Sequence, residues 1–178
     1  ERGSWYGCTK TSQEKLVQKS IESAKEDGKL DPDFKYVAVC PTVVLGPDLK
    51  VKDENVGGTM GRLLSWLTGG MKEAPNDSLS FIHVEDCADM HINGMELPHT
   101  SGRYMSLVES LHWNDIISLM AELYESMPSV QLYEGEDKAN PTQNNLEKMR
   151  TLQVNVKSTR EILSDSITFL RSVGALPQ

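Results

Sequence analysis

The chain has 178 residues, of which 38% are hydrophobic and 25% charged, which is ordinary for one globular domain or two closely packed parts. A formal net charge of −8 and an isoelectric point near 5.0 argue against nucleic acid as the main partner, because phosphate binding needs clustered positive charge. The sequence has no run of about eighteen apolar residues and no basic-then-apolar leader, so neither a membrane span nor a signal peptide is expected.

The first third of the chain predicts a helix followed by an inner strand. Residues 6–27 contain no proline, are rich in helix-forming residues and place an apolar stripe before Gly28, which predicts a helix. Residues 35–41, "KYVAVCP", are dense in strand-forming residues and predict a strand buried on both faces. Extended chain continues until Gly46 and Pro47 interrupt it. This order is typical of an α/β fold.

Helices and strands continue to alternate through the rest of the chain. Asp86, which directly follows an apolar run, is expected to open a helix and to accept backbone N–H bonds at its start. The polar, turn-rich stretch 135–145 is expected to be a loop over an open face. The further predicted helices are 59–68, 86–97, 113–125 and 166–178, and the further predicted strands are 79–84 and 103–108.

The stretch "WYGCTK" carries the first candidate chemistry. Tyr6 and Lys10 are four residues apart, so on a helix the phenol and the ammonium lie on one face. A nearby ammonium stabilises a phenolate, which makes tyrosine a competent acid or base. From the spacing alone, the more common arrangement is a half-buried tyrosine beside a solvated lysine, because structural pairs also perturb pKa values.

An ordered set of further motifs extends this observation. "YGCTK" at the head of a helix, "VCPTVVLGP", "FIHVEDCADMHI" and "SGRYMSL" follow one another along the chain. Together they resemble the C-terminal half of the extended short-chain dehydrogenases/reductases, the NAD-dependent epimerase/dehydratase-like family, nearest the group of dihydroflavonol, cinnamoyl-CoA and aldehyde reductases. The similarity runs through essentially all 178 residues.

The resemblance implies a fold class and roles for four residues. It implies an α/β fold comprising the C-terminal part of a Rossmann-like parallel sheet and the small substrate-binding lobe. Residues 1–50 would hold the last helix and strand of the Rossmann-like domain, and 51–178 the substrate-lobe and C-terminal elements, interleaved with it. Tyr6 would donate a proton to a substrate carbonyl, and Lys10 would bind the nicotinamide ribose. Pro41 and Thr42 would border the nicotinamide of NADP or NAD.

The sequence departs from the family in one important respect. The family's glycine-rich nucleotide turn and its Ser or Thr upstream of the tyrosine are not found, since "NVGGTMG" lacks the G-x-G-x-x-G spacing and follows no predicted strand. Ser4 is too close to Tyr6 to replace that serine and is expected to cap the helix. The N-terminal nucleotide-binding half is therefore expected to be absent from this chain.

Two functions of different class follow. In the first, the chain is part of an NADP-dependent carbonyl reductase that acts on a small-molecule carbonyl substrate and is inactive alone. In the second, it is a non-catalytic structural or accessory subunit of a larger assembly. In both, the apolar strand needs a partner, either the chain's own N-terminal half or another polypeptide.

The cysteines and histidines suggest neither disulfides nor a metal. Three cysteines, Cys8, Cys40 and Cys87, are an odd number and fall in predicted regular elements, so reduced thiols and a cytoplasmic or other reducing compartment are expected. His83, Cys87 and His91 have helical spacing, but His83 falls in a predicted strand and no fourth ligand is evident, so no metal is predicted.

Overall fold

A computed structural model gives the fold, and it describes residues 5–177. The chain separates into two compact units, Glu1–Tyr36 and Val37–Gln178. Ser4, the expected helix cap, lies outside the described residues. No helix within 5–177 combines the length and apolarity that crossing a membrane requires.

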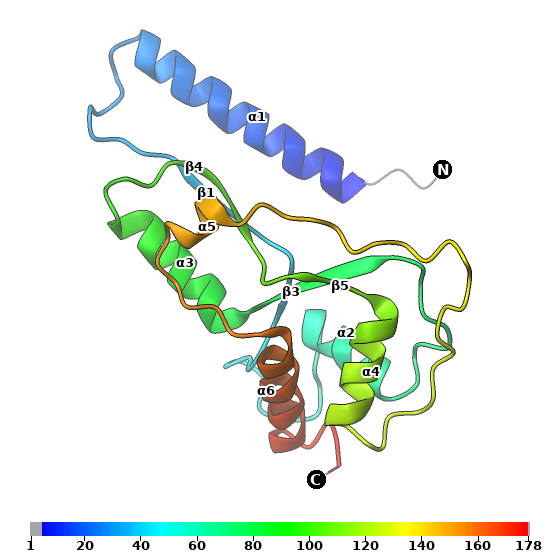
Figure 1. Ribbon diagram of the computed structural model, residues 1–178. Coiled ribbons are helices and arrows are strands. Elements are labelled where there is room, and N and C mark those ends of the chain that lie inside the picture. Colours follow the sequence, from blue (N-terminus) through cyan, green and yellow to red (C-terminus); the bar gives the residue numbers. More distant parts are fainter. Residues whose placement is uncertain (1–4, 178) are drawn as a thin grey trace. The chain divides into compact units, whose positions relative to one another are not determined.

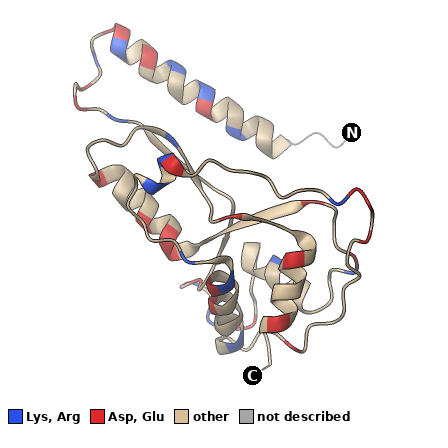
Figure 2. Ribbon diagram, in the orientation of Figure 1, with Lys and Arg blue, Asp and Glu red and all other residues tan. Residues whose placement is uncertain are grey.

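The first unit consists of one long helix, α1 (Trp5–Glu26), and the turn after it (Figure 1). Gly28 adopts a positive φ of 66°, and the N–H of Lys29 donates to the carbonyl of Ala24, which together end the helix where the sequence predicts. Lysine and glutamate positions are interspersed along α1 in Figure 2, and no described residue of the helix is buried.

The second unit contains the predicted parallel pair of strands. β1 (Val37–Pro41) pairs with β4 (Gly102–Ser106) in parallel, in a register that places Val37 opposite Gly102 and Pro41 opposite Ser106. Helix α3 (Val84–Glu96) packs on β1, and Gly94 permits a close approach because a Cβ there would lie 3.0 Å from Val37 Cγ1. A parallel pair joined through a helix is the arrangement of an α/β fold.

A second, mixed sheet lies in the same unit. Its strand order is β2 (Val43–Leu45), β3 (Ser78–His83) and β5 (Ser110–His112), with β2 parallel and β5 antiparallel to β3. The remaining helices are α2 (Gly58–Leu67), α4 (Trp113–Leu123), the short α5 (Glu147–Arg150) and α6 (Thr159–Ser172).

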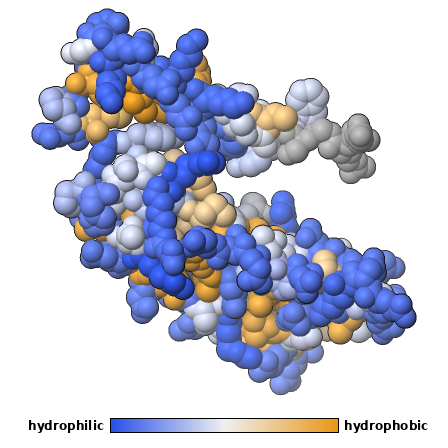
Figure 3. Space-filling view, turned by 45° about the horizontal axis from the view of Figure 1, so that its top comes forward, coloured by the Kyte–Doolittle hydropathy of each residue, from blue (hydrophilic) through white to orange (hydrophobic). Residues whose placement is uncertain are grey.

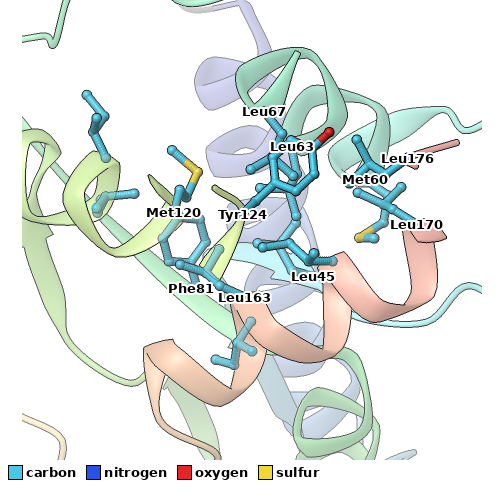
Figure 4. Packing of buried hydrophobic residues seen from close by; sticks show 14 of the residues in the cluster. Leu45, Met60, Leu63, Leu67, Phe81, Met120, Tyr124, Leu163, Leu170 and Leu176 are labelled. Atoms are coloured by element: carbon cyan, nitrogen blue, oxygen red, sulfur yellow. The ribbon is translucent and has the colours of Figure 1, made fainter. Parts of the chain in front are cut away.

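The core of this unit forms where β2 and β3 meet three helices. Figure 4 shows leucines and a methionine from α2, Phe81 from β3, Met120 from α4 and leucines from α6 pointing toward one another. A smaller cluster joins Ile82, Met90 and Tyr104 between β3, α3 and β4. Helices α2, α4 and α6 each bury one apolar face in this core, and that burial holds them in place.

Four predictions about elements differ from the structure. The strand β1 is only partly buried, because β4 is its one strand partner within residues 5–177. The last helix begins at Thr159, earlier than predicted, because Ser158 and Glu161 form a capping box. The strand β5 and the four-residue helix α5 were not predicted, since both are too short to show a period.

The predicted role of Asp86 at the start of its helix is wrong. His83 caps α3 instead, accepting the N–H of Glu85 on Nδ1 at 3.2 Å. Asp86 does accept a backbone N–H, but it is that of Lys157, 71 residues further along the chain, at 2.8 Å. Helix α3 therefore begins at Val84, two residues before the predicted start at Asp86, and the Asp86 carboxylate forms a tertiary contact.

Candidate active site

The structure brings Tyr6 and Lys10 together, as the spacing predicts. Both lie on α1, one turn apart, and Lys10 Nζ lies 5.7 Å from the centroid of the Tyr6 ring. Tyr6 is 75% exposed, so its hydroxyl is accessible to a ligand. The predicted shared face is confirmed, and the Lys10 ammonium lies within cation–π range of the Tyr6 ring.

Pro41 and Thr42 lie at the carboxyl end of β1, inside the second unit. Pro41 is the last residue of the strand, and the N–H of Thr42 donates to the carbonyl of Ser106 at 3.1 Å, which fixes it beside the end of β4. Ligands of open parallel sheets bind outside the carboxyl ends of the strands. The predicted proximity of this pair to Tyr6 and Lys10, which belong to the other unit, stays a prediction.

A pocket of about 340 Å³ opens at this position. Thr42, Met105 and Leu107 line it from the carboxyl ends of β1 and β4, and the first three residues of β3 line it from the mixed sheet. The whole lining consists of Thr42, Val43, Ser78, Leu79, Ser80, Met105, Leu107, Ser110, Thr142 and Asn144. This volume accommodates a small molecule.

Hydrogen bonds hold the loop side of the pocket in place. Ser80 Oγ and Ser110 Oγ are 2.6 Å apart across the β3–β5 pair, and Asn144 Nδ2 donates to Ser110 Oγ at 3.0 Å. Ser78 Oγ and Thr142 Oγ1 are 3.2 Å apart, and the N–H of Thr142 also donates to Ser78 Oγ at 3.2 Å. In Figure 1 the segment between α4 and α5 accordingly runs beside the mixed sheet.

A second feature fixes the same loop further upstream. Asn76 Oδ1 accepts the N–H of Ala139 at 2.7 Å, and its Nδ2 donates to the carbonyl of Asp137 at 3.0 Å. The side-chain amide of Asn114 binds the backbone of Tyr133 twice, because its Nδ2 donates to the carbonyl of Tyr133 and its Oδ1 accepts the N–H of Tyr133. The loop that closes the pocket is therefore tied to β3 and to the start of α4.

A charged cluster lies where β3, α3 and α6 meet. His83 is almost fully buried, and Lys157 Nζ is 2.8 Å from Glu85 Oε2 and 3.6 Å from Asp86 Oδ1. The hydrogen bond that Lys157 donates and its charge lower the pKa of Glu85, and the same hydrogen bond to Glu85 raises the pKa of Lys157. Lys157 thereby joins the segment before α6 to α3, which is a structural role. Within residues 5–177, His83 Nε2 is buried without a hydrogen-bond partner and lies 3.6 Å from Asp165 Oδ2.

The geometry of the residues considered for metal binding agrees with their predicted placement. His83 ends β3, whereas Cys87 and His91 lie on α3, with 4.0 Å between Cys87 Sγ and His91 Nδ1. His91 Nδ1 also lies 2.7 Å from the carbonyl oxygen of Cys87. Burial raises the pKa of the Cys87 thiol, which disfavours the thiolate that a metal needs. The absence of a metal remains a prediction.

No sequence pattern marks the residues that line the pocket from the loop. Ser110, Thr142 and Asn144 come from a short strand and a loop, where no periodicity marks a functional position. The one available signal was the polar stretch "ANPTQNN" inside the loop expected over an open face. The fold brings this stretch to β3 from more than sixty residues away.

Comparisons with known proteins relate this chain to reductases over part of their length. No protein-family model matches the chain. "Tetraketide alpha-pyrone reductase 2" of Arabidopsis thaliana is 30% identical over 178 residues, covering 97% of this chain and 51% of that protein. "Cinnamoyl-CoA reductase 1" of Arabidopsis thaliana is 28% identical over 174 residues, covering 97% of this chain and 47% of that protein. The chain thus spans about half the length of the curated relatives it matches.

Solved structures share the fold. Vestitone reductase from alfalfa superposes with a TM-score of 0.73 at 19% identity, covering 99% of this chain and 54% of that one. The yeast methylglyoxal/isovaleraldehyde reductase Gre2, determined in complex with NADPH, gives a TM-score of 0.72 at 18% identity, covering 92% of this chain and 50% of that one. UDP-glucose 4-epimerase of Thermotoga maritima gives 0.65 at 17% identity, covering 93% and 53%. With its parallel β1–β4 pair and its sequence relatives, the chain is a homologue, over about half their length, of cinnamoyl-CoA and tetraketide pyrone reductases in the extended short-chain dehydrogenase/reductase family.

Proposed function

We propose that this chain is the C-terminal half of an NAD(P)-dependent reductase of carbonyl compounds, with Tyr6 as proton donor and Lys10 as ligand of the nicotinamide ribose. The observation that carries the proposal is the exposed Tyr6–Lys10 pair, one helical turn apart with Nζ 5.7 Å from the ring centroid. It occurs in a chain that matches curated reductases over 97% of its own length.

The chain's residues fit one end of a nicotinamide dinucleotide. Lys10 offers three N–H donors for ribose hydroxyls, and Thr42 stands at the carboxyl end of a parallel strand, where dinucleotides bind in such sheets. The 178 residues contain no G-x-G-x-x-G turn, so the pyrophosphate end needs residues from outside this sequence.

The proposed reaction converts a carbonyl into an alcohol. When bound, the nicotinamide cofactor would supply the hydride that the carbonyl carbon receives, and would itself be oxidised. The Tyr6 hydroxyl donates its proton to the carbonyl oxygen as negative charge develops there, so that one hydride and one proton together give the alcohol. Lys10 stabilises the resulting Tyr6 phenolate, which then regains a proton from water.

Steady-state kinetics on the natural polypeptide that carries this sequence test the proposal. NADPH oxidation is followed with a panel of aldehydes and ketones, for the wild type and for Tyr6→Phe and Lys10→Met. Loss of the proton donor is expected to lower kcat by about a hundredfold or more. Lys15→Met, an exposed lysine on the same helix, is the matched control and is expected to leave kcat unchanged. Full turnover in Tyr6→Phe would show that Tyr6 is not the proton donor.

A further inference from the structure

The pocket at the carboxyl ends of β1 and β4 has an unusual lining for a site that handles anions. Of the ten described residues that line it, none carries an ionisable side chain. Four are apolar, and the other six offer only hydroxyls and one amide. Moving a carboxylate or phosphate into such a lining removes its water without supplying a cation, which is strongly unfavourable. The lining therefore favours an uncharged molecule.

The hydrogen bonds around Asn144 define what the polar side of the pocket offers. Both hydrogens of its amide are engaged, because Nδ2 donates to Ser110 Oγ at 3.0 Å and to the carbonyl of Thr142 at 3.2 Å. Within residues 5–177, no donor reaches its Oδ1. The amide is thus oriented by protein contacts, and the atom it has left for a ligand is an acceptor.

The serine hydroxyls beside Asn144 are also engaged in hydrogen bonds within the protein. Ser110 Oγ accepts from Asn144 and shares one hydrogen with Ser80 Oγ at 2.6 Å, while Ser78 Oγ is engaged with Thr142. Ser80 is buried, so the pairing of β3 with β5 fixes the series of hydrogen bonds from Asn144 through Ser110 to Ser80. A ligand that reaches Asn144 is consequently required to donate a hydrogen bond.

We infer that Asn144 determines substrate specificity by accepting a hydrogen bond from a hydroxyl group of an uncharged carbonyl substrate. The inference rests on the proposed function, since it treats the pocket beside Thr42 as the place of the substrate. The carbonyl end faces the carboxyl ends of β1 and β4, the hydroxyl end meets Asn144, and Val43, Leu79 and Met105 cover the body between them. A nucleotide sugar, whose diphosphate is anionic, is excluded from this pocket.

Three benzaldehydes that differ at one position test this inference on the natural polypeptide that carries this sequence. They are 3-(hydroxymethyl)benzaldehyde, 3-methylbenzaldehyde and 3-carboxybenzaldehyde, with kcat/KM measured for each with NADPH. One neutral hydrogen bond predicts a preference of about fivefold to tenfold for the hydroxymethyl over the methyl compound. The carboxylate is expected to be poorer than the methyl compound by about a hundredfold.

Variants connect the preference to one side chain. Asn144→Leu is expected to abolish the preference for the hydroxymethyl over the methyl compound. The neighbouring exposed residue provides the control, Gln143→Leu, which is expected to keep the preference. An unchanged preference in Asn144→Leu, or a wild type that reduces the carboxylate best, overturns the inference.

Binding measured without turnover separates this inference from the proposed function. The three compounds and UDP-glucose are titrated into the protein without nicotinamide, and saturation-transfer NMR reports which of them binds. Absence of reduction with a retained, Asn144-dependent preference in binding refutes the proposed function and supports the inference. Binding of UDP-glucose that excludes 3-(hydroxymethyl)benzaldehyde overturns the inference.

Discussion

Removing the Asp86 carboxylate is expected to destabilise the second unit, although Asp86 does not cap its own helix. The side chain is only 5% exposed, and Oδ2 accepts the N–H of Lys157 at 2.8 Å. Oδ1 also lies 3.6 Å from Lys157 Nζ. The one carboxylate thus binds the segment that leads into α6 both by a hydrogen bond and by charge.

The structure gives the size of this effect. A hydrogen bond to a charged group contributes about 1.5–3 kcal/mol, and a carboxylate in the first turn of a helix adds about 0.3–1 kcal/mol. Asp86→Ala is therefore expected to lower the free energy of unfolding by about 2–4 kcal/mol. For a protein of this size that corresponds to a fall in Tm of about 4–16 °C. Asp86→Asn keeps an acceptor and is expected to cost about half as much.

Thermal and urea unfolding followed by circular dichroism measure the effect. Asp89→Ala is the matched control, because Asp89 lies on the same helix and is exposed, and its effect is expected to stay within about 0.5 kcal/mol. In a Lys157→Met background, which keeps the backbone N–H, most of the cost of Asp86→Ala is expected to persist. Equal effects of Asp86→Ala and Asp89→Ala would refute the proposed tertiary role of this carboxylate.

Three further predictions follow from the thiols, the charged cluster and the missing nucleotide turn. Because burial raises the pKa of Cys87 and Cys8 is exposed, a disulfide reagent is expected to modify Cys87 at least about tenfold more slowly in single-cysteine proteins, and equal rates would contradict this. Because Lys157 lowers the pKa of Glu85, the stability from this pair is present above the ordinary value of 4.5 and is lost as the pH falls through the lowered value. Lys157→Met, but not the exposed control Lys138→Met, is therefore expected to flatten the rise of Tm between about pH 3 and about pH 7. The 178-residue chain alone is expected to bind NADPH weakly or not at all in a fluorescence titration and to show no turnover, and micromolar binding by a monomer would overturn that expectation.

The partly exposed strand β1 bears on how the isolated chain behaves. Within residues 5–177 it pairs with β4 alone, and it carries valines that are only half-buried. Figure 3 shows apolar surface between hydrophilic side chains on the face it displays. An apolar strand with one partner is prone to further pairing. The need of this chain for a partner stays a prediction, and its association state in solution tests it.

The sequence by itself determined the elements that have a clear residue period or clear residues at their ends. The long helix that carries Tyr6 and Lys10 has no proline and ends at a glycine with positive φ, so local propensity decides both its course and the shared face of the pair. The parallel strand at Val37–Pro41 is marked by its run of strand formers. The capping box at Ser158 was equally visible, and it predicts the true start of α6 better than the apolar period further along.

Tertiary structure alone decided the contacts that join distant segments. Asp86 has the residue type and position of a helix cap, yet His83 takes that role, because the backbone of Lys157 competes for the carboxylate from 71 residues away. The pocket lining depends in the same way on Thr142 and Asn144, which reach β3 and β5 through a loop without any period. A local pattern reports on neighbours within one or two turns of the chain, whereas these contacts form only when the sheet brings separate segments together.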